Sequence, residues 1–278
     1  MKKQEKAGVK LQIILIALVA VLLVTVLIWL FAGGGNDDPA PTATASGQAD
    51  VTAGPTEEPT PEPTPSPLPT EEPTPTFAPV PSGFADVTDY VPDAVIDIRY
   101  STYYNFMGRP ANGYKANRAL LCTEACRALK NAADSLRQRG YRIYIFDAYR
   151  PRDAVLDFVE WGKDPSDTKM KQAFYPNLEK EDLFKMYISS DSNHSRGGTI
   201  DMTIVRADLT PVDMGTGFDW FGEEAHMFYE GCTEEQKANR ALLREAMENA
   251  GFSSITSEWW HFVLKDTPYT EAFNFPVE

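Results

Sequence analysis

Residues 192–201 read Ser-Asn-His-Ser-Arg-Gly-Gly-Thr-Ile-Asp, and residues 258–261 read Glu-Trp-Trp-His. The chain has only three histidines, and two of them, His194 and His261, fall in these segments. The first segment has the form S-x-H-x-x-G-x-x-x-D and the second the form E-x-x-H. Together they offer two imidazoles and the carboxylate of Asp201, with Glu258 beside the last imidazole. Catalytic zinc sites typically combine three such ligands with one open position. The two segments therefore predict a zinc site.

The residues around each segment suggest how the chain brings them together. His194 lies among polar residues, which favours a ligand over a core histidine. Two glycines then allow a tight turn into an apolar strand, expected at 199–205, that carries Asp201 near its start. Residues 258–264 are rich in Trp and Phe and are expected to form the last strand. E-x-x-H alone occurs by chance, and Glu258 alone reads equally as a surface ion-pair partner, so the prediction rests on the combination.

Two side chains are candidates for the chemistry. A carboxylate beside a metal site can accept a proton from attacking water and pass it to the leaving amine, which is the role predicted for Glu258. Arg150 follows an apolar segment and precedes Pro151. Its guanidinium is placed to stabilise an oxyanion, although an ordinary loop arginine is the simpler alternative. The third histidine, His226, has no partner motif and is read as a surface residue.

The pattern of apolar residues indicates a mixed fold. Alternating patterns predict strands, and amphipathic periodicity with a capping box at Thr233–Gln236 predicts helices. The expected strands are 94–100, 142–147, 199–205 and 258–264, and the expected helices are 123–139, 152–161 and 233–250. These elements do not follow a regular β-α-β order. The sequence therefore predicts an α+β domain with a mainly antiparallel sheet and flanking helices.

The N-terminal region predicts a membrane anchor. Residues 11–32 are an uncharged apolar run, long enough to cross a bilayer as a helix. Four lysines lie in the tail at 1–10, and no Lys or Arg follows the run until Arg99. This asymmetry predicts a cytoplasmic N-terminus and an extracytoplasmic remainder, hence a single-pass cell membrane protein. A cleaved signal peptide is the alternative, but its apolar region is usually only about 7–15 residues.

Residues 33–82 are predicted to be a disordered linker, and residues 83–278 a single domain. The linker holds most of the chain's prolines, and the hexapeptide TEEPTP at 56–61 recurs at 70–75. Such a composition buries too little apolar surface to offset chain entropy, so it is typical of an extended spacer. The remainder is long enough for one domain with a proper core.

Charge and cysteine content exclude other classes of protein. The formal net charge is −14, and the region after residue 82 is itself acidic. Nucleic acid is therefore not an expected partner, because phosphate contacts need a basic face. Three cysteines, at 122, 126 and 232, are too few and too irregular for a disulfide framework or a cysteine metal site.

Several further motifs accompany the two histidine segments. They are Tyr100-Ser-Thr, Asn105-Phe-x-Gly108, Gly113-Tyr-x-x-Asn-Arg118, Asp147-x-Tyr-Arg-Pro151 and Phe218-Asp219. Together the motifs resemble the D-alanyl-D-alanine dipeptidase family, the VanX type of the zinc DD-peptidases that share a fold with the Hedgehog signalling domain. The likeness covers nearly all of residues 89–264. The histidine segments are common to the wider group, and the Asn105 and Gly113 motifs indicate the dipeptidase branch.

The resemblance implies roles for individual residues. His194, Asp201 and His261 would be ligands of one Zn²⁺ ion, with Glu258 as general base and Arg150 as the group that stabilises the transition state. Four further residues, Ser192, Tyr100, Tyr114 and Asp219, match positions that line the pocket for a free dipeptide, and Asp219 would hold the substrate ammonium.

The expected function is zinc-dependent hydrolysis of D-Ala-D-Ala, or a closely related D,D-dipeptide, outside the membrane in cell-wall peptide metabolism. Two alternatives stay open. One is a D,D-carboxypeptidase that trims peptidoglycan stem peptides, and the other is a non-catalytic, zinc-containing wall-binding module. Familiar members that act in glycopeptide resistance work inside the cell, so the predicted anchor implies a different physiological role.

Overall fold

A computed structural model describes residues 77–278 of the chain. The predicted cytoplasmic tail, the membrane helix at 11–32 and the linker up to residue 76 lie outside the described residues. Within residues 77–278, no helix combines the length and apolarity needed to cross a membrane.

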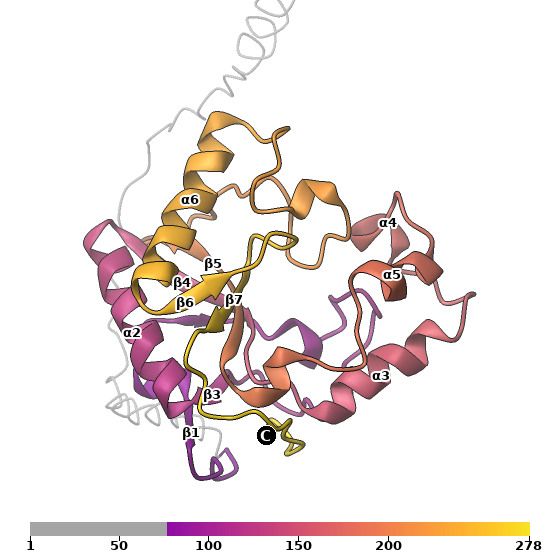
Figure 1. Ribbon diagram of the computed structural model, residues 1–278, viewed down its shortest axis with the longest axis horizontal. Helices are drawn as coiled ribbons and strands as arrows, with labels where there is room; N and C mark the ends of the chain where they lie inside the picture. Colours follow the sequence, from indigo (N-terminus) through magenta and orange to yellow (C-terminus); the bar gives the residue numbers. More distant parts are fainter. Residues whose placement is uncertain (1–76) are drawn as a thin grey trace, which may run out of the picture. The chain divides into compact units, whose positions relative to one another are not determined.

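A five-stranded sheet forms the centre of the domain, with strand order β2-β4-β5-β7-β6 (Figure 1). Its strands are β2 (Val95–Ile96), β4 (Tyr141–Asp147), β5 (Thr199–Arg206), β6 (Phe252–Ser254) and β7 (His261–Leu264). Only the β2–β4 pair is parallel, and the other three pairs are antiparallel. A separate antiparallel pair joins β1 (Phe84–Asp86) to β3 (Leu120–Cys122). The predicted α+β class is confirmed, with a mixed sheet that is mainly antiparallel.

Two long helices pack against each other and against the sheet. Helix α2 (Thr123–Gln138) contacts β4, and α6 (Glu234–Asn249) contacts β6 (Figure 1). The inner face of α2 is apolar, with Ala125, Leu129 and Leu136 fully buried. The predicted capping box begins α6: the Thr233 hydroxyl accepts from the Gln236 amide, and the Gln236 side chain accepts from the Thr233 amide. Both helices therefore form where the sequence predicts them.

Three shorter helices lie on the opposite side of the sheet from α2 (Figure 1). They are α3 (Arg152–Gly162), α4 (Lys171–Phe174) and α5 (Lys180–Met186). The ring of Phe184 in α5 lies where a Cβ on Gly162 would be, 2.0 Å from its ideal position, so the glycine permits the close approach of α3 and α5. Short 3-10 helices complete the domain: η1 (Val87–Asp89), η2 (Arg99–Ser101), η3 (Asn193–Arg196) and η4 (Glu223–Ala225).

The strand predicted at 94–100 is much shorter in the structure, and this part of the prediction is wrong. Strand β2 covers only Val95–Ile96, and the chain then turns into η2. The Ile98 amide donates to the Asn117 side chain instead of to a neighbouring strand. Because the amide is satisfied there, the chain can leave the sheet and turn Tyr100 into the interior, where its side chain is 2% exposed.

Candidate metal centre and substrate pocket

Two of the predicted ligands come together because their strands are neighbours. Asp201 in β5 and His261 in β7 are directly paired in the antiparallel ladder. Directly opposed residues of two strands project from the same face of a sheet. The Asp201 Oδ1 atom lies 2.9 Å from His261 Nδ1. The sheet register, rather than the local motif, therefore joins these two residues.

His194 reaches the same point from η3. The Ser192 hydroxyl begins η3 by accepting from the His194 amide at 3.3 Å. Gly197 ends it in the left-handed region, with φ +76°, and a Cβ there would lie 2.4 Å from the Phe84 ring. Only glycine fits both conditions. The predicted tight turn between His194 and the strand of Asp201 is thus present, and His194 is 2% exposed.

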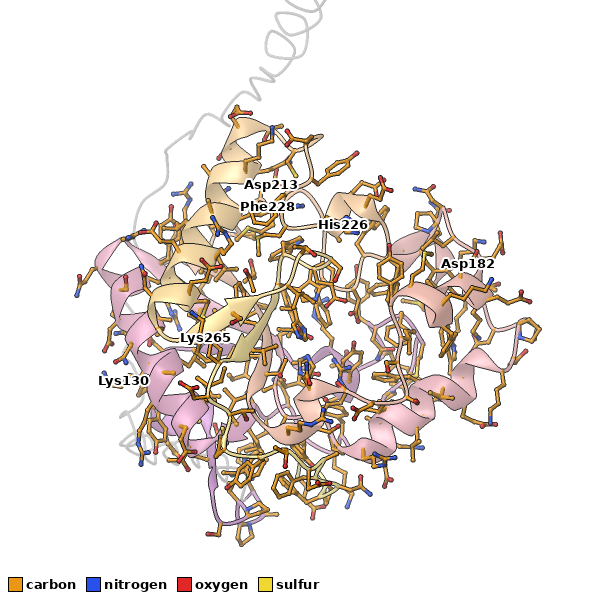
Figure 2. The ribbon with its side chains drawn as sticks, in the orientation of Figure 1. Lys130, Asp182, Asp213, His226, Phe228 and Lys265 are labelled. Carbon is orange, nitrogen blue, oxygen red and sulfur yellow. The ribbon has the colours of Figure 1, made fainter. Side chains whose placement is uncertain are left out.

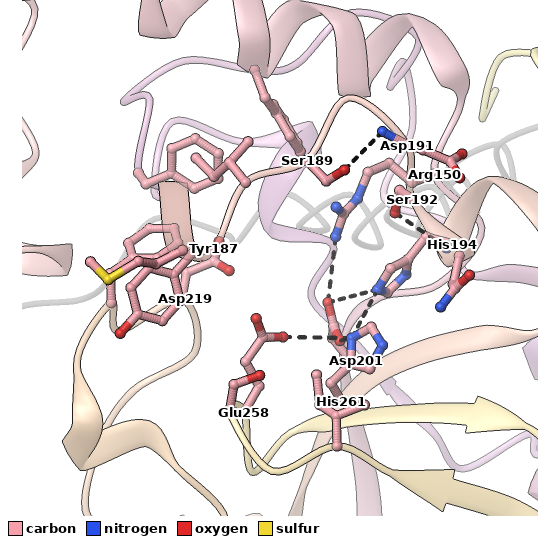
Figure 3. Close-up of a pocket in the computed structure, with 18 of the residues that line it drawn as sticks. Arg150, Tyr187, Ser189, Asp191, Ser192, His194, Asp201, Asp219, Glu258 and His261 are labelled. Atoms are coloured by element: carbon pink, nitrogen blue, oxygen red, sulfur yellow. Dashed lines mark hydrogen bonds and ion pairs between the residues drawn. The ribbon is translucent and has the colours of Figure 1, made fainter. Parts of the chain in front are cut away.

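The donor atoms of these three residues fit a zinc ion. His194 Nδ1 lies 2.7 Å from the Ala148 carbonyl, which requires a proton on Nδ1 and leaves Nε2 as a lone-pair donor. This Nε2 lies 3.2 Å from Asp201 Oδ2 and 3.3 Å from His261 Nδ1. Ligands about 2.0–2.1 Å from a tetrahedral ion lie about 3.3 Å apart. The three residues therefore have the donor types and the spacing of a zinc site (Figure 3).

Glu258 lies next to the three donors without belonging to them. It precedes β7, and its Oε2 atom is 3.6 Å from His261 Nδ1 (Figure 3). Burial raises the pKa of Glu258; the imidazole of His261 lowers it, and the Asp201 carboxylate raises it further. A carboxylate with a raised pKa next to a metal centre is suited to taking up and returning a proton.

The Arg150 side chain faces the same centre, and the Asp147 carboxylate holds it in place. Its Nε donates to Asp147 Oδ2 at 2.8 Å, and its terminal nitrogen lies 3.5 Å from Asp201 Oδ2. The guanidinium also lies over the ring of Tyr100, 4.8 Å from its centroid. The ion pair with Asp147 leaves the rest of the planar donor group directed towards the centre, as an oxyanion-stabilising role requires.

Tyr114 does not line the pocket, which corrects the role that the resemblance implied for it. Its hydroxyl donates to Asp147 Oδ1 at 2.5 Å, and the residue is buried behind Arg150. Asp147 therefore accepts from two side chains that the sequence placed in the site. Asp147 itself received no role from the sequence, although a charged residue that ends the apolar strand 142–147 is a usable indication.

The metal centre opens into a cavity of about 260 Å³. This is below the range of about 300–1,000 Å³ for pockets that hold drug-sized ligands, so the cavity suits a small substrate. Three of the predicted substrate-binding residues, Ser192, Asp219 and Tyr100, line it together with the catalytic candidates. The sequence did not identify the apolar wall formed by Met186, Tyr187 and Ile188, because no motif marks the end of α5 (Figure 3).

Asp219 is a buried carboxylate without a cationic partner among the described residues. It accepts from the Tyr100 hydroxyl at 2.8 Å, and none of the ion pairs within residues 77–278 includes it. Burial and the nearby Asp201 carboxylate raise its pKa well above the ordinary value. Burial and Asp219 likewise raise the pKa of Tyr100, which keeps the phenol protonated as the donor. The cavity therefore offers a place for a positively charged group.

His226, the third histidine, lies outside the cavity. It is labelled in Figure 2 and follows η4, and its backbone carbonyl accepts from Arg240 on α6. Its side chain is not among the residues that line the cavity. The structure thus separates it from the other two histidines, in line with its interpretation as a residue without a ligand role.

The geometry of the site defines a metal-dependent hydrolase, and comparisons with known proteins give the family. A profile of the D-Ala-D-Ala dipeptidase family of peptidases matches residues 81–278. The chain belongs to this family of zinc metallopeptidases.

Curated relatives carry the same family name along nearly their full length. The D-alanyl-D-alanine dipeptidase of Enterococcus faecium is 38% identical over 199 residues, which cover 70% of this chain and 98% of the relative. Those of Streptomyces coelicolor and Escherichia coli are 35% and 31% identical, and the matches cover 70% and 69% of this chain and 98% and 87% of the relatives.

A solved structure also resembles the chain. It is that of the vancomycin resistance D,D-pentapeptidase VanY from a VanB-type resistance cassette, in complex with Zn(II). The two are 14% identical with a TM-score of 0.34, over 55% of this chain and 76% of the other.

Removing one imidazole should release the metal. We expect His261→Ala to weaken zinc affinity by more than the 10–100-fold typical of losing an outer-shell partner, because a direct ligand is lost. Zinc content after dialysis, measured by atomic emission, checks this. His226→Ala is the matched control and should retain zinc like the unmodified chain. Full zinc content in His261→Ala would remove this residue from the ligand set.

Proposed function

We propose that this chain hydrolyses D-Ala-D-Ala, or a closely related free D,D-dipeptide, with His194, Asp201 and His261 holding zinc. One observation supports the proposal above the others: these donors and Glu258 share a small cavity with the unpaired carboxylate of Asp219. The peptide bond of the substrate would lie at the metal end of the cavity. Its free amine would contact the Asp219 carboxylate. The family membership gives the same activity.

Glu258 is proposed as the general base. When bound, zinc supplies a Lewis acid that polarises a carbonyl and makes water more acidic. The Glu258 carboxylate takes the proton of the attacking water and then hands it to the leaving amine, so it is regenerated in each turnover. Its Oε2 atom lies 3.6 Å from His261 Nδ1, and this short distance supports the proposed role.

Arg150 is proposed to stabilise the negative charge that forms on the carbonyl oxygen. It is 13% exposed at its side chain, and the ion pair with Asp147 holds it before substrate arrives. A donor fixed in advance needs no reorganisation during the reaction, and this preorganisation is the main source of electrostatic catalysis. A mobile surface arginine would not offer it.

Asp219 and Tyr100 are proposed to hold the substrate ammonium, and Ser192 to contact the bound dipeptide. An ammonium group would give the buried Asp219 carboxylate its missing charge partner. A stem peptide, whose corresponding nitrogen is an amide, lacks this charge. The unpaired carboxylate therefore favours a dipeptidase over a D,D-carboxypeptidase, and the presence of Glu258 and Arg150 favours an enzyme over a wall-binding module.

The location is also a proposal: residues 11–32 anchor the chain in the cell membrane, and the enzyme faces outward. The lysines before the apolar run and the absence of Lys and Arg from residues 33–98 support this orientation. The Pro-rich linker would hold the domain away from the bilayer. The substrate would then come from cell-wall peptide metabolism.

Glu258→Gln should abolish hydrolysis while it leaves the metal in place. The amide keeps the size of the side chain but accepts no proton, so kcat should fall by about 100-fold or more. D-Ala release from D-Ala-D-Ala and zinc content are measured on the same samples. A variant that loses zinc would show instead that Glu258 belongs to the ligand set.

Acetylation of the substrate amine should prevent cleavage. N-acetyl-D-Ala-D-Ala lacks the ammonium group that would pair with Asp219. Its kcat/KM should therefore be lower on the order of 100-fold, which corresponds to the loss of one charged hydrogen bond. Steady-state kinetics with both substrates check this. The variant Asp219→Asn should reduce the ratio of the two kcat/KM values. Equal rates on both substrates would favour the carboxypeptidase alternative.

Protease treatment of intact spheroplasts tests the proposed location. The full chain should lose its domain to added protease while a cytoplasmic marker protein stays whole, because the linker lies outside. A variant that lacks residues 1–32 should be protected until the cells are lysed. Protection of the full chain before lysis would contradict an extracytoplasmic domain.

A further inference from the structure

Arg240 is a buried cation that makes no ion pair among the described residues. It lies on α6 and is 1% exposed. Its guanidinium donates only to backbone carbonyls: Nε to Met214 at 2.7 Å, and its two terminal nitrogens to His226 at 2.6 Å and Glu224 at 2.8 Å. It does not line the substrate cavity. Its position thus requires an explanation other than contact with substrate.

Placing this charge in the interior is costly. Burial lowers the pKa of Arg240, which reflects the unfavourable transfer of a guanidinium out of water. Three hydrogen bonds to neutral carbonyls compensate only part of that transfer. An apolar side chain would fill the same volume without this cost, but it would leave the three carbonyls without donors. The guanidinium is therefore suited to holding those carbonyls in place.

The three carbonyls belong to the two ends of one segment, residues 214–226, which carries Asp219. Met214 is its first residue, His226 is its last, and Glu224 lies two positions before the end. Gly215, with φ +89°, packs on the guanidinium: a Cβ there would lie 3.1 Å from a terminal nitrogen of Arg240. Arg240 thus fastens both ends of a loop, and the loop presents Asp219 to the cavity.

Asp219 needs such support because its backbone is in the left-handed region, with φ +59°. Aspartate is one of the few residues besides glycine that adopt this region, but the conformation still costs free energy that the surrounding structure has to offset. The hydrogen bond from the Tyr100 hydroxyl holds the carboxylate itself. The ends of the loop are held by Arg240.

The same loop is bonded to the segment before β7, next to the general base. The Trp259 amide donates to the Ala225 carbonyl at 3.0 Å, and the amide of Met227, directly after the loop, donates to the Thr256 carbonyl at 2.9 Å. The indole of Trp259 also donates to the Thr216 hydroxyl at 2.8 Å. Trp259 directly follows Glu258. A displacement of the loop would therefore reach both ends of the substrate pocket.

We infer that Arg240 is a positioning residue that sets substrate recognition through the loop 214–226 and its Asp219 carboxylate. The inference rests on the proposed function, because the ammonium contact of Asp219 belongs to that proposal. It assigns a role in binding to a side chain on α6, outside the cavity.

The test uses Arg240→Lys in the zinc-loaded full chain. Lysine keeps the charge but cannot donate to three separated carbonyls from a planar fork. KM for D-Ala-D-Ala should rise about tenfold, with a much smaller change in kcat and with zinc content unchanged. Amide hydrogen exchange across 214–226 should accelerate. Arg244→Lys is the matched control on the same helix, where Arg244 pairs with Glu248 at 3.3 Å, and it should behave like the unmodified chain.

A coupling measurement separates positioning from a general loss of stability. In the Asp219→Asn background, Arg240→Lys should raise KM no further, because the contact it supports is already gone. An equal rise of KM in both backgrounds would overturn the inference, and so would unchanged exchange of the loop amides. If the unmodified chain does not cleave D-Ala-D-Ala, the proposed function fails, and amide exchange alone still decides whether Arg240 fixes the loop.

Discussion

The pairing of Asp201 with His261 across β5 and β7 is the constraint on which the site depends. It places a carboxylate and an imidazole on one face of the sheet at 2.9 Å, before any metal is considered. The remaining groups approach that pair from loops: His194 through the turn at Gly197, and Arg150 from the end of β4. A one-residue shift in the register would turn one of the two ligands to the opposite face. Two of the three proposed ligands are therefore held by the central sheet.

Buried carboxylates outnumber buried cations around this pair. The pKa values of two of these carboxylates, Asp201 and Asp219, are shifted in opposite directions. Burial alone would raise the pKa of Asp201, but the imidazoles of His194 and His261 outweigh it and hold that pKa well below its usual range. Asp219 has no comparable neighbour, and its pKa is raised. Asp201 thus has the charge that a metal ligand requires, and the proposed ammonium of the substrate would stabilise the charged form of Asp219. In the proposed function, metal and substrate together would balance the charge of the cavity.

The sequence predicted the local parts of this arrangement better than the long-range ones. The capping box at Thr233 and the apolar face of α2 are local features, so both helices were predictable. The grouping of the two histidine segments was predictable because few histidines exist to choose from. The position of the Tyr114 side chain was not predictable. Its hydrogen bond to Asp147 joins residues 33 positions apart and depends on how the tyrosine packs behind Arg150. The short β2 was missed because the Asn117 side chain, distant in sequence, replaces a strand partner.

The residues of the metal centre and the Asp219 carboxylate are held in place by different kinds of contact. Strand pairing fixes Asp201 and His261, and an ion pair fixes Arg150. Asp219 instead lies on a loop that is held by carbonyl contacts to Arg240. The loop carries none of the three metal ligands, although Phe218 and Phe221 within it are themselves buried. If Asp219 holds the amine as proposed, a change in the loop 214–226 would alter amine recognition, while the strand pairing of Asp201 with His261 would be retained.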